Sequence, residues 1–202
     1  METKSEARRA WRVARLALAA LILAGSDAAL AHTGLEHAVS FASGFKHPWT
    51  GLDHMLAMLA VGLWAGLNGG RALWAWPVAF VGVMLAGGAL GIAGMSVPMV
   101  EPGILASVIV LGLLVLAAAH MPVVLGAALV AVFALLHGHA HGAELPAQAA
   151  AATYAVGFAL ATALLHGLGL GVATLCRGDT GRLVVRGAGA LVAAAGVALA
   201  VV

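Results

Sequence analysis

Two short groups of imidazoles and carboxylates stand out in this chain because almost everything around them is apolar. Only 9% of the 202 residues are charged, whereas 63% are hydrophobic. Ionisable groups inside a bilayer are costly and usually mark a path for an ion or a proton. Imidazoles combined with carboxylates suit borderline divalent metals such as nickel, cobalt and zinc, so we expect a transition-metal site. The two groups comprise His47, Asp53 and His54, and then His137, His139, His141 and Glu144.

The composition predicts an all-α, polytopic membrane protein. The mean hydropathy is +1.05, and the long apolar runs are separated by short segments rich in Gly and Pro. Helices suit a bilayer because they satisfy their backbone polar groups internally. A single cysteine, Cys176, excludes an intrachain disulfide framework and a cysteine-based metal cluster. Half of the ten basic residues precede residue 16, so the basic balance indicates targeting and no nucleic-acid partner.

Residues 1–31 have the pattern of a cleavable signal peptide. A basic start is followed by the apolar stretch 16–24 and by small residues up to Ala31. The alternative is a retained first helix, but the apolar stretch is about half the length that a span needs. Cleavage after Ala31 leaves a transmembrane domain of residues 32–202 and makes His32 its N-terminus. The terminal amine and imidazole of His32 would then form a bidentate chelator. The equal alternative is that His32 and its neighbours are only polar residues that lead into the first span.

Six transmembrane helices are expected after this leader. The connections assigned to the cytoplasm carry Arg71, Arg177 and Arg182, whereas only Lys46 lies outside. This distribution places the mature N-terminus in the periplasm and the chain in the bacterial inner membrane. The expected spans are 47–67, 73–95, 103–119, 122–140, 148–173 and 183–202.

This topology brings both groups to one face of the membrane. The first span runs inwards and begins with its group, while the fourth runs outwards and ends with the other. His47 and His54 are seven residues apart, which is about 10 Å along a regular helix. Either Pro48 and Gly51 break the first turn, or the two histidines serve separate stations.

The fourth expected span carries a stripe of ligands. His137, His141 and Glu144 are spaced i, i+4, i+7 and share a face, whereas His139 points elsewhere. The sequence Ala-Leu-Leu-His-Gly at 134–138 recurs at 163–167. The second copy puts His166 in the inner half of the fifth span. His166 is then either an inner relay for the ion, or the repeat is a coincidence in a chain rich in Ala and Leu.

The chain resembles the HupE/UreJ family at these residues. The family motif H-x5-D-H matches His47, Asp53 and His54. The second motif, F-H-G-x-A-x-G-x-E, matches from His137 to Glu144, with Leu136 in place of Phe. The resemblance implies that His47, Asp53, His54, His137 and Glu144 are functional. It also implies a nickel, sometimes cobalt, permease associated with hydrogenase or urease systems.

We therefore expect a secondary transporter of Ni²⁺ or Co²⁺ that is not an enzyme and holds no cofactor tightly. A metallochaperone of hydrogenase or urease maturation is the expected protein partner. The chain has no Gly-x4-Gly-Lys-Ser/Thr phosphate loop. Three alternatives remain open: an intramembrane metal-dependent hydrolase, although H-E-x-x-H is absent; a haem-binding subunit; and a metal sensor or delivery partner that does not transport.

Overall fold

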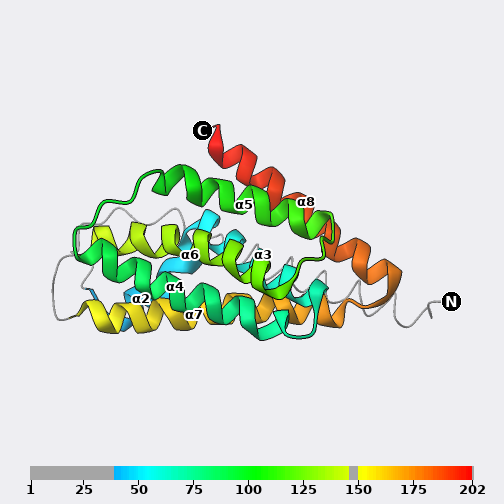
Figure 1. Cartoon of the computed structure of the whole chain (residues 1–202), viewed down its shortest axis with the longest axis horizontal. Coiled ribbons are helices and arrows are strands. Elements are labelled where there is room, and N and C mark those ends of the chain that lie inside the picture. The colour runs from blue at the N-terminus through cyan, green and yellow to red at the C-terminus, as the bar shows by residue number, and fades with distance from the viewer. Residues whose placement is uncertain (1–38, 146–149, 202) are drawn as a thin grey trace.

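The computed structural model describes residues 39–145 and 150–201, and every regular element within these ranges is an α-helix, as the sequence predicts. The expected leader 1–31 and His32 lie outside the described residues. Figure 1 shows the arrangement of the helices. They are α2 (Phe41–Thr50), α3 (Leu52–Asn68), α4 (Ala72–Ile92), α5 (Val100–Leu116), α6 (Val123–Glu144), α7 (Ala151–Leu175) and α8 (Gly178–Ala200).

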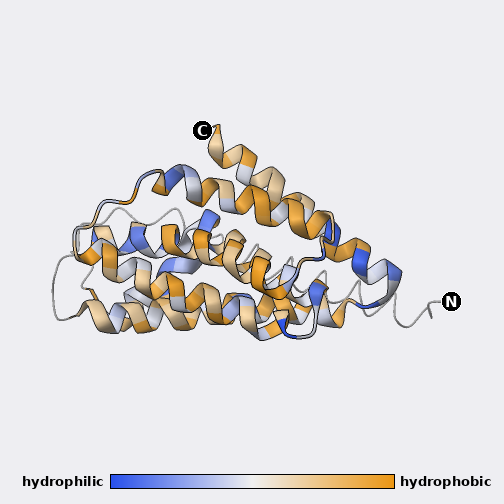
Figure 2. Ribbon diagram, viewed as in Figure 1, coloured by the Kyte–Doolittle hydropathy of each residue, from blue (hydrophilic) through white to orange (hydrophobic). Residues whose placement is uncertain are grey.

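Several of these helices are long and apolar enough to cross a membrane. Four of them, α4, α6, α7 and α8, have 21 to 25 residues and qualify alone. The consecutive helices α2 and α3 qualify only together, as a broken span or a re-entrant loop, and α5 is apolar but has only 17 residues. Figure 2 shows hydrophobic residues along the helices and the most hydrophilic stretches near helix ends and connections. A multi-span membrane protein is thus supported, whereas the count of six spans stays a prediction.

The expected first span, 47–67, is wrong as a single helix. The chain is already helical from Phe41, and it turns by 83° between α2 and α3. The helix α2 begins at a capping box, in which the side chains of Ser40 and Ser43 each bond the backbone N–H of the other. The part of this region that could cross a membrane therefore has two separate directions.

The helices pack as three close pairs: α3 on α7, α4 on α6 and α5 on α8. Glycines make the close approach possible, because a Cβ at Gly62, Gly138 or Gly112 would overlap the backbone of the partner helix. Small residues at such contacts let helices associate tightly in lipid, where no hydrophobic force drives them together. In Figure 1 the pair of α5 and α8 lies along one side of the other helices.

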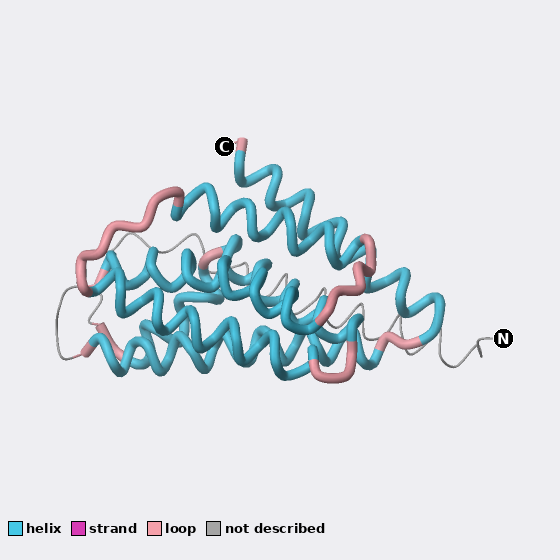
Figure 3. The backbone as a smooth tube through the Cα atoms, in the orientation of Figure 1, coloured by secondary structure: helices cyan, strands magenta, loops and turns pink. Residues whose placement is uncertain are grey.

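The end of the bundle where α3 stops is closed by polar anchors on the connection between α5 and α6. The indole rings of Trp64 and Trp76 are in contact, with centroids 4.1 Å apart and their planes tilted by 30°. Their N–H groups donate to the carbonyl oxygens of Ala119 and Val123, at 2.8 and 2.9 Å. The amide of Asn68 bonds the same connection at both of its polar atoms. Figure 3 shows this connection and the others at the two ends of the helices.

Two glycines of α8 give a matched test of the packing. A Cβ at Gly189 would meet the backbone of Leu116 and Gly112, whereas a Cβ at Gly187 meets nothing within 4 Å. We expect Gly189→Ala to lower the free energy of unfolding in detergent by about 1–3 kcal/mol through overpacking. Gly187→Ala should leave it unchanged or raise it by up to about 1 kcal/mol, because Ala favours the helix. Equal values for the two variants would contradict this packing.

Candidate metal-binding site

The break between α2 and α3 positions the first group of ligands. Pro48 has no N–H to give to a helix, and Gly51 takes an extended conformation that ends α2 and precedes α3. Because of the turn, the ring centroids of His47 and His54 lie 6.2 Å apart rather than about 10 Å along an unbroken helix. Of the two alternatives for these histidines, the break is therefore the one observed.

Gly51 is also needed for space. A Cβ there would lie 3.1 Å from His54 Nδ1 and 3.2 Å from Asp53 Oδ1. Any larger residue would crowd this ion pair. The break and the pair that follows it thus depend on the same position.

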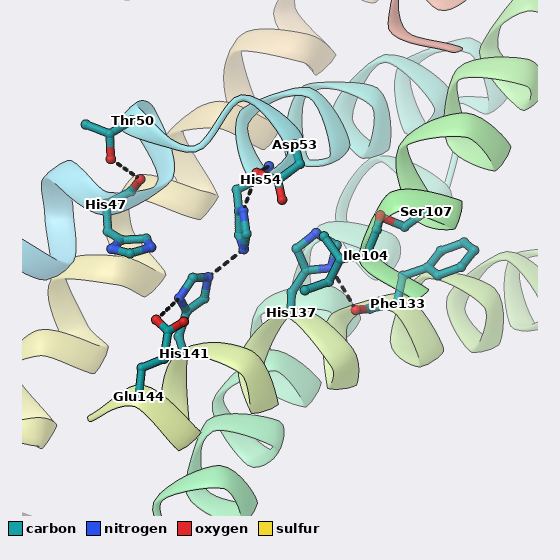
Figure 4. A network of polar contacts seen from close by, with 10 residues as sticks. All are labelled: His47, Thr50, Asp53, His54, Ile104, Ser107, Phe133, His137, His141 and Glu144. Carbon is teal, nitrogen blue, oxygen red and sulfur yellow. Dashed lines mark hydrogen bonds and ion pairs between the residues drawn. The ribbon is translucent and has the colours of Figure 1, made fainter. Parts of the chain in front are cut away.

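The two sequence groups meet inside the bundle. His54 and His141 point their Nε2 atoms at each other across 2.6 Å, although they are 87 residues apart in sequence. The ring of His47 lies 4.4 Å from that of His141, and the ring of His137 lies 5.0 Å from that of His54, centroid to centroid. Figure 4 shows the four imidazoles, which we call the histidine cluster, between α2, α3 and α6. The topology inferred from the sequence predicted this meeting.

Two histidines of the cluster donate a hydrogen bond from Nδ1 to an acceptor outside the cluster. His54 Nδ1 donates to Asp53 Oδ1 at 2.7 Å, and His137 Nδ1 donates to the carbonyl oxygen of Phe133 at 2.9 Å. Since both acceptors lack a proton to give, the neutral rings must keep their lone pairs at Nε2. Such outer hydrogen bonds are typical of metal-ligating histidines, whose orientation and basicity they set. His137 Nε2 is buried and has no partner among the described residues.

The side chains are close together but not yet arranged around one point. Among the described residues, no three His, Cys, Asp or Glu side chains have the geometry to hold an ion as they stand. Metal–nitrogen bonds of about 2.0–2.1 Å with tetrahedral angles separate two ligating nitrogens by about 3.3–3.4 Å. The 2.6 Å between His54 and His141 is therefore short by about 0.7 Å. The rings of His47 and His141, inclined at 73°, would also have to rotate.

The two carboxylates lie at the edge of the cluster. The side chain of Asp53 is 26% exposed and stands behind His54, so it positions that ring. Glu144 is 71% exposed, and its Oε2 lies 3.9 Å from His141 Nδ1, too far for a hydrogen bond. The two carboxylates therefore stand beside different imidazoles, at opposite ends of the cluster in Figure 4.

The structure does not bring every expected ligand into the cluster. His139 faces another way, as its position on the helix predicts, and its Nε2 lies 2.6 Å from the carbonyl oxygen of Met95. His166 is buried in α7 and is not one of the four clustered rings, although it contacts the ring of Phe80, as His137 does. His32 falls outside the described residues.

Aromatic residues that the sequence did not single out form the walls of the cluster. Phe158 of α7 lies 4.7 Å from His141 and 6.0 Å from His47, and Tyr154 lies 6.2 Å from His47, between ring centroids. Their i, i+4 spacing was visible, but nothing in the sequence placed this face of α7 against the histidines. Both rings line a cavity of about 280 Å³ between α4, α6 and α7, which His141 also lines.

These features define a class: a polytopic helical membrane protein with buried imidazoles converging from helices distant in sequence. The chain belongs to the HupE/UreJ family, whose model, described as HupE / UreJ protein, matches residues 18–199. It is similar to Protein HupE of Rhizobium leguminosarum bv. viciae, with 50% identity over 184 residues, which cover 91% of this chain and 95% of that protein. No solved structure matches the chain.

The held ring of His137 has a spectroscopic consequence. Its bond to the Phe133 carbonyl predicts a neutral ring protonated at Nδ1 and bare at Nε2. We expect the nitrogen NMR shifts of histidine-labelled, metal-free protein at neutral pH to show this tautomer, assigned by its loss in His137→Gln. A His137 signal with the proton on Nε2 would refute the proposed orientation.

Proposed function

We propose that this protein is a secondary transporter that carries a divalent transition-metal ion into the cell, with Ni²⁺ as first choice and Co²⁺ as second. The observation that carries the proposal is the convergence of His54 and His141 at 2.6 Å, with His47 and His137 beside them. Nitrogen donors of this kind suit nickel, cobalt and zinc. Membership of the HupE/UreJ family favours nickel or cobalt among these.

The order of charges along the site supports a sequence of steps. A hydrated ion arriving from the periplasm first meets the exposed carboxylate of Glu144 and the half-buried one of Asp53. It then exchanges water for the Nε2 atoms of His54 and His141, while Asp53 keeps the His54 ring aligned. Neutral imidazoles suit this task because they bind the ion strongly but add no charge to an apolar interior.

The proposed orientation puts the histidine cluster on the periplasmic side of the inner membrane. This follows from the excess of arginines in the opposite connections, including Arg71 and Arg177. The ion released inside would pass to a metallochaperone for the maturation of hydrogenase or urease. No ATP-binding segment is needed if an ion gradient drives the movement.

The contacts of Asp53 argue against its acting as the general base of a hydrolase. Such a base must be free to take a proton from water, but Asp53 already accepts hydrogen bonds from the ring and the backbone N–H of His54. A metal sensor or delivery partner would use the same ligands as a transporter. Flux of ions across a sealed membrane separates these two functions.

Asp53→Asn is the sharpest single test of the proposed site. Asn keeps the size of the side chain but loses the charge that holds and polarises the His54 ring. Loss of such an outer partner lowers metal affinity or activity about 10–100-fold. We therefore expect the initial rate of radioactive nickel uptake into proteoliposomes, at nickel concentrations well below saturation, to fall by about that factor.

Asp179→Asn is the matched control, because Asp179 is exposed in the first turn of α8. Its uptake should equal that of the unmodified protein. Parental uptake by Asp53→Asn would remove Asp53 from the mechanism. Nickel binding without any flux in the unmodified protein would instead support the sensor or delivery function.

A further inference from the structure

His166 is a buried imidazole without any hydrogen-bond partner. It sits within α7 with 1% of its surface exposed, and both of its ring nitrogens lack a partner among the described residues. Nearly all buried polar atoms in proteins are paired, so an imidazole with two unpaired nitrogens needs an explanation. The histidine cluster supplies no hydrogen bond to either nitrogen of His166, although the ring of Phe80 contacts both His137 and His166.

Two successive contacts join α4 and α7 near His166. In one, the ring of Phe80 packs edge-to-face on that of His166, with centroids 5.0 Å apart. In the next, the hydroxyl of Thr162 lies 3.7 Å from the sulfur of Met84. Thr162 is four residues before His166 on α7, and Met84 is four residues after Phe80 on α4, so the two contacts are neighbours along the same pair of helices.

We propose that His166 forms a second, inner binding position for the transported divalent ion, with Thr162 and Met84 as auxiliary donors. This inference rests on the proposed function, because it adds a station to the same path. His137 Nε2 is also unpaired, and the ring of His137 contacts the same Phe80 ring that His166 contacts. An ion that leaves the outer cluster thus finds the next nitrogen donor one aromatic ring away.

The alternative explanation is a structural histidine bonded to buried water. The two explanations differ in the number of ions that the protein binds. An inner ion position adds a second bound ion per chain, whereas a water-linked histidine adds none. The stoichiometry of the whole protein therefore decides between them.

The test combines nickel stoichiometry with flux, using the full chain in detergent and in proteoliposomes. At saturation we expect two nickel ions per unmodified chain and one per His166→Gln chain. The initial rate of nickel uptake by His166→Gln should fall at least tenfold. His120→Gln is the control, because His120 is exposed in the connection between α5 and α6, and it should keep both ions and the parental rate.

A measurement on the unmodified protein guards against misfolding of the variant. Crystals grown with nickel should give an anomalous-scattering peak beside the His166 ring as well as one at the histidine cluster. One ion per chain with no peak at His166, or parental flux in His166→Gln, would overturn the inner position and leave the proposed function standing. Neither binding nor flux of nickel in the unmodified protein would overturn both.

Discussion

The arrangement of the whole site is governed by the short contact between His54 and His141. Two imidazole nitrogens lie 2.6 Å apart in an apolar bundle, where unpaired polar groups are costly. His54 Nδ1 donates to Asp53, so the Nε2 of His54 is bare and accepts a hydrogen bond from the Nε2–H of a neutral His141. The lone pair of His141 is then at Nδ1, which has no hydrogen-bond partner among the described residues. For both Nε2 atoms to bind one metal ion, the proton between them would have to leave His141 Nε2.

The cluster lies on the joint between two tightly packed helix pairs. His54 belongs to the pair of α3 and α7, whereas His137 and His141 belong to the pair of α4 and α6. Glycines bring the backbones together within each pair, where a larger side chain would overlap the partner helix. The distance between His54 and His141 therefore depends on how the two pairs pack against each other.

The parts of this site that could be predicted are those set by helical periodicity and by topology. The stripe of His137 and His141, the diverging direction of His139 and the meeting of the two groups all follow from 3.6 residues per turn and alternating spans. The relation of His47 to His54 could not be fixed, because Pro48 and Gly51 permit a break without setting its angle of 83°. The aromatic wall of Phe158 was missed since it depends on which face of α7 packs against α2, and that choice rests on close contacts such as those of Gly44 and Gly157.

The two ends of the bundle use their polar groups in opposite ways. At the histidine cluster, the carboxylate of Glu144 is exposed and bonded to nothing nearer than 3.9 Å among its described ion pairs, so it remains available to a cation. At the other end, the indoles of Trp64 and Trp76 and the amide of Asn68 are hydrogen-bonded to the backbone that joins α5 to α6. Separating that backbone from the indoles would leave two buried N–H groups unpaired, which is costly. The polar groups at this end are therefore committed to holding the structure together, whereas the carboxylate of Glu144 at the other end stays exposed.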